Sequence, residues 1–158
     1  MTTAPVQPPT VVGDVLPDAD FSDAYATVLR EPGANAHDVT TRAFANMPPW
    51  IARLLRLRNA VVRPLGLKPA PDRSLPADRQ IGFFPIVSSA PDRVVLGFDD
   101  RHLDFRIVID VGNVSATESN VTATTLVKRN NLLGTVYLAL VMPFHKRIVP
   151  ALLERIAS

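Results

Sequence analysis

Apolar and polar residues alternate with a period of two over much of the second half of the chain. This pattern predicts three consecutive strands, and a fourth segment rich in Thr and Val predicts another. The predicted strands are Ile81 to Ser88, Arg93 to Phe98, His102 to Val111, and about Thr117 to Arg129. Short polar turns join the first three strands, which indicates an antiparallel meander. The third strand is apolar on one side only, so we expect one buried and one solvated sheet face.

Helical signals lie on both sides of this meander. Asn130-Asn131 is expected to cap a helix from Leu132 to about Ala157, roughly 40 Å long at 1.5 Å per residue. Pro48-Pro49 opens a second helix that runs to about Leu65, and Asp38 is the expected cap of a shorter helix through Asn46. The segment from Asp20 to Leu29 suits either a first strand or a short helix.

This order of elements predicts an α+β fold of the helix-grip type. A curved antiparallel sheet grips a long C-terminal helix, and two helices lie between the first strand and the meander. Residues 1–19 begin with MTTAPVQPPT and are expected to form a disordered, Pro-rich tail, which leaves residues 20–158 as a single domain. Pro143 is expected to bend the last helix. A sheet curled about a long helix is difficult to fill with side chains, so we expect a cavity.

Composition excludes several classes of function. The 158 residues include no cysteine, which excludes a disulfide framework, a thiolate metal site and a cysteine nucleophile. A net charge of +2 is too small to indicate a nucleic-acid partner. The most apolar run, Leu132 to Phe144, is shorter than the roughly 20 residues of a bilayer span and contains a proline. We therefore expect a buried helix, no stable membrane insertion and a cytoplasmic location.

Four stretches of this sequence resemble a bacterial domain family of unknown function. That family is placed in the START-like, birch-pollen-allergen-like (SRPBCC) superfamily of helix-grip proteins. The stretches are PPWIARLLRLRNAVVRPLGL (Pro48 to Leu67), LGFDDRHLDFR (Leu96 to Arg106), TTLVKRNNLLGTVYL (Thr124 to Leu138) and MPFHKRIV (Met142 to Val149). The resemblance covers roughly Asp20 to Ile156.

The resemblance implies a helix-grip fold with a cavity for an apolar small molecule. Some relatives look fused to a dehydrogenase-like domain that binds a nucleotide. This chain has no glycine-rich GxGxxG fingerprint, so no cofactor is expected on it. Any role of NAD(P) would require a separate, dehydrogenase-like protein partner.

Arg58 is the sharpest candidate for a functional residue. On a helical wheel, Trp50, Leu54, Val61 and Leu65 lie on one side of it, and Ile51, Leu55 and Val62 lie on the other. A buried guanidinium requires a partner. That partner is a carboxylate, for which Asp104 and Glu118 are the candidates, a set of carbonyl groups, or a ligand anion held in an apolar pocket.

The other candidates favour structural roles. His102, Asp104 and Arg106 share one strand face, and we expect salt bridges on the side away from the cavity. His145 lies among apolar residues of the last helix and is expected to be a satisfied core group. The histidines have no metal-ligand spacing, and no motif of a nucleophilic serine is present, so neither a metal site nor catalytic residues are assigned.

The sequence thus predicts a protein that holds an apolar or amphipathic small molecule between the sheet and the C-terminal helix. One alternative is an enzyme of the cyclase or hydratase kind, and another is an accessory module for the dehydrogenase-like partner. The expected ligand-binding residues are Leu54, Arg58, Leu96, Phe98, Phe105, Ile107 and Tyr137.

Overall fold

The computed structural model describes residues 3–9, 12–45, 47–66 and 75–157. In this part of the chain a seven-stranded antiparallel sheet has the order β1-β2-β7-β6-β5-β4-β3. The strands are β1 (Ala4–Val6), β2 (Phe21–Leu29), β3 (Gln80–Ile81), β4 (Phe84–Ser89), β5 (Arg93–Asp99), β6 (Leu103–Asn113) and β7 (Ser119–Arg129). The helices are α1 (Ala36–Ala45), α2 (Pro49–Val62) and α3 (Leu132–Ala157), with short 3-10 turns η2 (Arg63–Leu65) and η3 (Ala77–Arg79).

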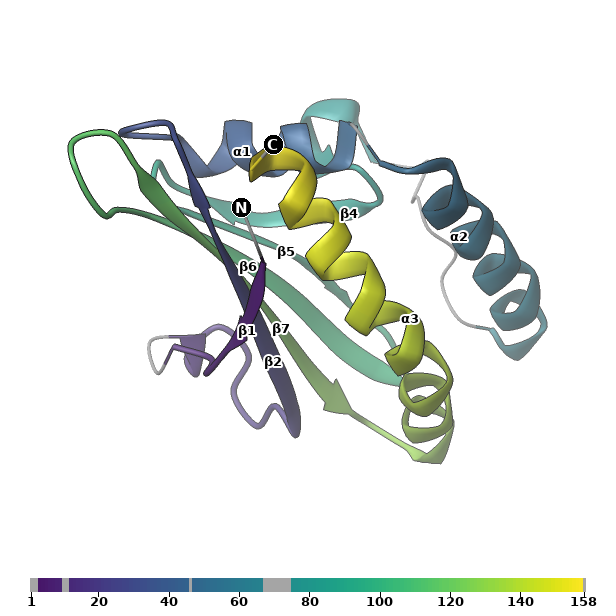
Figure 1. The fold of residues 1–158 in the computed structure, drawn as a ribbon. Coiled ribbons are helices and arrows are strands. Elements are labelled where there is room, and N and C mark those ends of the chain that lie inside the picture. The colour runs from purple at the N-terminus through teal and green to yellow at the C-terminus, as the bar shows by residue number, and fades with distance from the viewer. Residues whose placement is uncertain (1–2, 10–11, 46, 67–74, 158) are drawn as a thin grey trace.

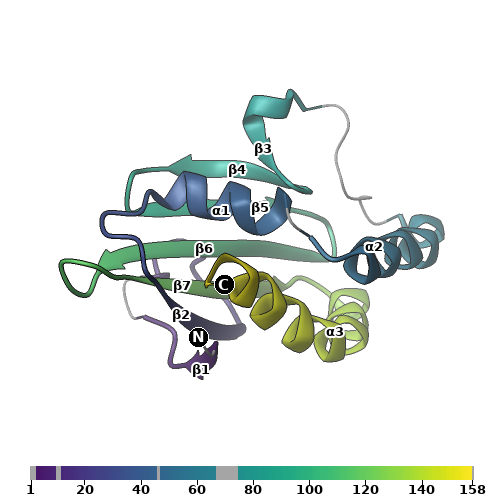
Figure 2. The ribbon, with the colours of Figure 1, turned by 45° about the horizontal axis from the view of Figure 1, so that its top comes forward.

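The sheet is curved, and α3 lies across its inner face (Figures 1 and 2). Helix α1 covers the same face beside the C-terminal end of α3, whereas α2 lies apart from both. The predicted helix-grip architecture is therefore confirmed. The ambiguous segment from Asp20 to Leu29 is a strand, β2, which pairs with β7 along its whole length.

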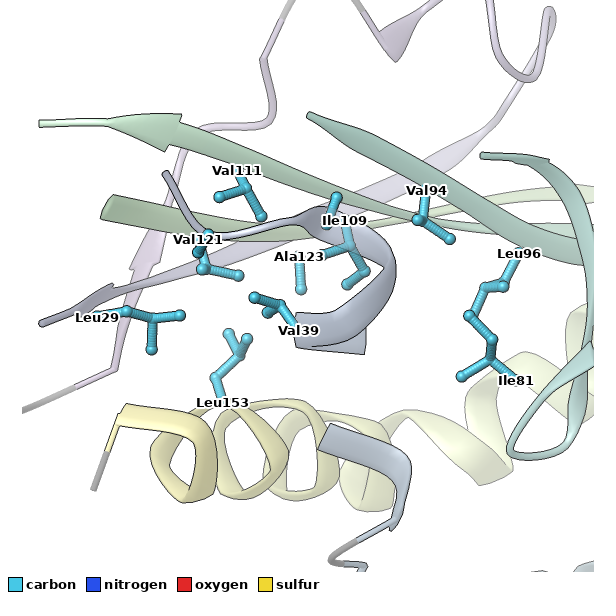
Figure 3. Packing of buried hydrophobic residues seen from close by; sticks show 12 residues of the cluster. Leu29, Val39, Ile81, Val94, Leu96, Ile109, Val111, Val121, Ala123 and Leu153 are labelled. Carbon is cyan, nitrogen blue, oxygen red and sulfur yellow. The ribbon is translucent and has the colours of Figure 1, made fainter. Parts of the chain in front are cut away.

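The main hydrophobic core lies where α1 and the C-terminal end of α3 meet the sheet (Figure 3). Val39 of α1 and Leu153 of α3 pack there against Leu29, Val121 and Ala123 of β2 and β7. Apolar side chains thus fill this end of the grip, and the rest of α3 is covered less completely by the sheet.

The alternation predicted for β6 is confirmed on the inner face, where Ile109 and Val111 belong to the main core. The outer face differs from the solvated surface that we expected. Val108 is fully buried there and belongs to a second apolar cluster. The cover is the N-terminal segment, whose Val12 and Leu16 are only 3% and 7% exposed.

The structure also differs from the expected disordered tail at residues 1–19. Ala4–Val6 form β1, which pairs with β2 at the sheet edge, and Val12 and Leu16 pack on the outer face. The apolar residues between the prolines are the physical reason, because they bury against Val95, Val108 and Leu126. Residues 1, 2, 10 and 11 lie outside the described residues.

Side chains next to the helices define where two of them begin. Asn131 Oδ1 accepts a hydrogen bond from the Gly134 amide at 3.0 Å, which confirms the predicted cap of α3. The cap of α1 is Asn35 rather than Asp38, because the Asn35 side-chain oxygen Oδ1 accepts a hydrogen bond from the backbone amide of His37 at 2.9 Å. Asp38 instead lies in the first turn, where its charge suits the helix dipole.

Helix α2 begins at Pro49, as predicted, and its last turn continues as η2 up to Leu65. Gly66 follows with a positive φ of 73°, the conformation expected of a helix-ending glycine. Asn46, the expected end of the shorter helix, and residues 68–74 of the expected surface loop lie outside the described residues.

Helix α3 is less buried than its apolar sequence predicts. Within it only Gly134, Leu152 and Leu153 are buried, and both Pro143 and Pro150 lie inside it. Gly134 permits a close approach to the β5–β6 turn, because a Cβ atom there would lie 2.0 Å from the His102 carbonyl oxygen. The apolar surface of α3 that the sheet does not cover faces the cavity or solvent.

Candidate functional site

An open cavity of about 420 Å³ lies between the inner face of the sheet, α2 and α3. Its floor is formed by β5, β6 and β7, and its sides are formed by α2 and by the part of α3 between Tyr137 and Leu152. Among the described residues that line it, all are apolar except four: Arg58, Thr125, Tyr137 and His145. The curvature of the sheet and the separation of α2 from α3 together leave this volume unfilled.

Six of the seven expected ligand-binding residues line this cavity: Leu54, Arg58, Phe98, Phe105, Ile107 and Tyr137. Their role in binding stays a prediction, but the structure brings them together from α2, the sheet and α3. Leu96 is the exception. It is fully buried and packs beside Ile81 in the main core, because the short strand β3 covers this position (Figure 3).

Aromatic side chains form a continuous wall on one side of the cavity. The Phe84 ring lies 5.9 Å from Phe44 and 5.4 Å from Phe105, and Phe98 lies 5.8 Å from Phe105. These centroid distances fall in the range of favourable edge and offset contacts. The rings support one another, so the wall is preformed and requires no ligand to order it.

Arg58 lies at the centre of the cavity side of α2, as the helical wheel predicts. Its Nε donates a hydrogen bond to the Tyr137 hydroxyl at 2.9 Å, and its Nη1 donates to Asn59 Oδ1 at 3.0 Å. The guanidinium carbon lies 5.3 Å from the centre of the Tyr137 ring, within cation–π range. The Arg58–Tyr137 pair joins α2 to α3 across the cavity.

The carboxylates that we expected beside Arg58 lie elsewhere. Among the described residues, neither Asp104 nor Glu118 forms an ion pair with Arg58. Asp104 instead accepts a hydrogen bond from the Asn130 amide at 3.1 Å. The helical wheel therefore located the arginine on the correct face but could not identify its partner on α3.

The mouth of the cavity has apolar side chains on both helices. Leu57 and Val61 of α2 are 59% and 51% exposed, and Leu140 of α3 is 61% exposed. A cluster of half-exposed apolar side chains marks a binding surface more often than single, scattered apolar side chains do. The arginines Arg53 and Arg56 of α2 are also exposed but do not belong to the cavity lining.

Sequence reasoning missed the pairing of His145 with Asp23. The His145 Nε2 atom lies 2.9 and 3.0 Å from the two Asp23 carboxylate oxygens, and His145 also lines the cavity. The side chains are 13% and 21% exposed. The histidine is thus satisfied, as expected, but by a carboxylate beside the cavity and not by core packing alone.

A signal for this pair is present in β2. Alternate residues of β2 face inward, and two of them, Thr27 and Leu29, are buried. Asp23 occupies the same face, where a carboxylate is unusual and needs a partner. The ambiguity between strand and helix in this segment concealed the pattern.

Tyr25, two residues after Asp23, packs against the main core. Burial raises the pKa of its phenol, and the negative charge of Asp23 raises that pKa further. The Tyr25 phenol therefore lies on the same inner face of β2 as Asp23, the partner of His145.

The His102, Asp104 and Arg106 triplet points away from the cavity, as predicted. Arg106 forms an ion pair with Asp99 at 2.8 Å and donates to the Phe105 carbonyl at 2.8 Å. His102 Nδ1 lies 3.0 Å from the Asn131 amide nitrogen, which ties the turn to the start of α3. These contacts stabilise the fold and do not form part of the cavity.

Two further properties of the described residues bear on the kind of site. No group of three or more His, Cys, Asp or Glu side chains there could hold a metal ion. Helix α3 is long and apolar enough to cross a membrane by length and composition alone, with a mean hydropathy of 1.4 over its most apolar window. In the structure this helix packs on the sheet and α1.

Comparisons with known proteins add a family assignment. No curated protein and no solved structure shows a significant match. A family model described as a protein of unknown function (DUF2867) matches residues 15–152, which include all the strands of the grip except β1 and all the residues that line the cavity. The chain therefore belongs to the DUF2867 family.

Proposed function

We propose that this protein binds an apolar or amphipathic small molecule in the cavity between the sheet, α2 and α3. The observation that carries the proposal is an open cavity of about 420 Å³ with a preformed apolar wall and few polar groups. Small-molecule sites range from roughly 300 to 1,000 Å³ and have this same composition. The helix-grip arrangement also supports placing the family in the START-like superfamily.

The polar groups favour a ligand that has a polar head and an apolar chain. Arg58 and Tyr137 stand together near the exposed apolar mouth, where a head group would remain close to solvent. The chain would extend along the aromatic wall, where each buried methylene contributes about 0.8 kcal/mol. An anionic head would add a charge-assisted hydrogen bond to the guanidinium.

Isothermal titration calorimetry with dodecanoate and dodecanol tests this proposal. We expect Arg58→Met to weaken dodecanoate binding by about 10-fold to 100-fold, since a hydrogen bond to a charged group contributes roughly 1.5–3 kcal/mol. Binding of dodecanol should change much less, because it has no charge to lose. Methionine keeps much of the side-chain volume, so the apolar wall stays complete.

Arg56→Met is the matched control, since Arg56 lies on the same helix but outside the cavity lining. It removes the same charge and should leave both affinities unchanged. Equal weakening by the two substitutions would show that the charge acts only at long range. Failure of the wild-type protein to bind either compound would contradict the proposal itself.

A further inference from the structure

The pairing of His145 with Asp23 places an imidazole that is hydrogen-bonded to a carboxylate in the lining of the cavity. His145 lies on α3 and Asp23 on β2, and Nε2 approaches both carboxylate oxygens within 3.0 Å. A neutral imidazole that donates its Nε2 proton to a carboxylate has Nδ1 as its basic nitrogen. The same arrangement, a histidine oriented by a carboxylate, is the general base of many enzymes.

The remaining ionisable groups of the cavity lining do not suit this role. The Arg58 guanidinium carries donors only and has no acceptor atom. The Tyr137 hydroxyl already accepts a hydrogen bond from Arg58. Among the described residues that line the cavity, His145 is therefore the group best able to remove a proton from a bound molecule.

We propose that His145 is a general base that abstracts a proton from a ligand bound in the cavity, with Asp23 as its positioning residue. The inference rests on the proposed function, since it requires a ligand in the cavity. The suited substrate is an amphipathic molecule whose apolar part carries an acidic C–H bond, such as one next to a carbonyl group.

The proton balance of this step needs no further reactant. The imidazole takes the proton, the electron pair of the C–H bond moves into the carbonyl, and an enolate forms. The Asp23 carboxylate stabilises the imidazolium, which then returns the proton to the same carbon or to a conjugated one. The net reaction is an isomerisation or an exchange of that proton.

The spacing along α3 fits such a substrate. Tyr137 and His145 are eight residues apart and both line the cavity. At 1.5 Å per residue this spacing separates the Arg58–Tyr137 pair from the base by about 12 Å along the helix. A polar head held at the pair would therefore place a more distant carbon beside His145.

Base-promoted opening of nitrobenzisoxazole tests the proposal with a defined probe. A base removes the ring C–H proton, the electron pair forms the nitrile, the N–O bond breaks, and a coloured phenolate results. We would measure kcat and KM with the full-length protein and its variants. Thermal unfolding and dodecanoate binding of each variant would be measured in parallel.

We expect His145→Gln to lower kcat by about 100-fold, the scale of general base catalysis. Asp23→Asn should lower kcat by about tenfold with little change in KM, and Asp23→Glu should restore part of the loss. His102→Gln is the matched control, because His102 is a histidine outside the cavity lining, and it should leave kcat unchanged. A kcat unchanged by His145→Gln would overturn the proposal and leave the pair as a structural link between α3 and β2.

Competition keeps the proposal testable if His145→Gln does not fold. Dodecanoate should inhibit the wild-type reaction, and a rate that saturating dodecanoate leaves unchanged would also overturn the proposal. Dodecanoate binding without any opening of the probe would refute the role of His145 as a base and leave the proposed function standing. Absence of dodecanoate and dodecanol binding together would refute the proposed function instead.

Discussion

Arg58 illustrates what a single residue reveals at the level of sequence. A charge at the centre of an apolar helix stripe has to meet a partner or a ligand, because an unpaired buried guanidinium is costly. The structure supplies Tyr137, 79 residues away, as one partner. No local pattern connects these two positions, so only the placement of α2 across the cavity from α3 could identify the pair.

Tyr25 leads to a prediction about pH. Burial and the Asp23 charge raise the pKa of its phenol above the ordinary value of about 10, so the folded protein holds this proton more tightly than the unfolded chain does. The contribution of Tyr25 to the free energy of unfolding is therefore fully present below about pH 10 and is lost as the pH rises through the folded pKa.

Urea unfolding of the wild-type protein and of Tyr25→Phe between about pH 9 and pH 11 measures this effect. We expect the free energy of unfolding to fall less steeply with pH in the variant, because the other titrating groups are common to both proteins. Identical slopes would mean that the phenol is no harder to ionise in the folded state than in the unfolded one.

At the level of elements, α3 combines a well-defined start with a loosely covered body. Asn131 caps its first turn, and the Asn131 amide also contacts the Arg101 carbonyl at 3.4 Å and His102 Nδ1 at 3.0 Å. The middle of the helix faces the cavity, so its apolar residues remain partly exposed. The element is thus fixed at its two ends and lines a hollow between them.

We predict that Asn131→Ala destabilises the protein by about 1 kcal/mol, the usual cost of a lost helix cap. Chemical denaturation measures the change. Asn131→Ser is the control. The serine hydroxyl can still accept a hydrogen bond from the Gly134 amide, but it is too short to replace the contacts of the Asn131 amide group with Arg101 and His102. A serine variant as unstable as the alanine variant would assign the cost to the turn contacts rather than to the cap.

At the scale of the whole molecule, the sheet is covered on both faces. The helices cover the inner face, and residues 12–19 cover part of the outer face through Val12 and Leu16. The N-terminal segment is therefore an integral part of the fold, although its many prolines predict disorder. Its short apolar stretches predict packing on the sheet only when the outer face of β5, β6 and β7 is known to be apolar.

We predict that Leu16→Ala lowers the free energy of unfolding by about 2–4 kcal/mol, because a buried leucine leaves a cavity when it is truncated. Val6→Ala in the same segment is the control. Val6 is 40% exposed, so its truncation should cost less than about 0.5 kcal/mol. Urea denaturation measures both changes. If Leu16→Ala lowered the free energy of unfolding as little as Val6→Ala does, the segment would not pack on the sheet in solution.

The sequence by itself determined the class of fold, the meander, the long capped helix and the face of α2 that carries Arg58. These features depend on local periodicity and capping, which neighbouring residues encode. The alternation of apolar residues in the predicted strands also placed Phe98, Phe105 and Ile107 on the inner face, because alternation in a strand sets the direction of each side chain.

Only the tertiary structure decided which residues meet across the grip. The strand β2 had no clear period, so the inward position of Asp23 and its contact with His145 could not be read from the chain. Leu96 has the right alternation for the cavity but is covered by Ile81 of β3. Pairings between distant elements depend on sheet curvature and helix placement, and these arise from the sum of all contacts rather than from any one segment.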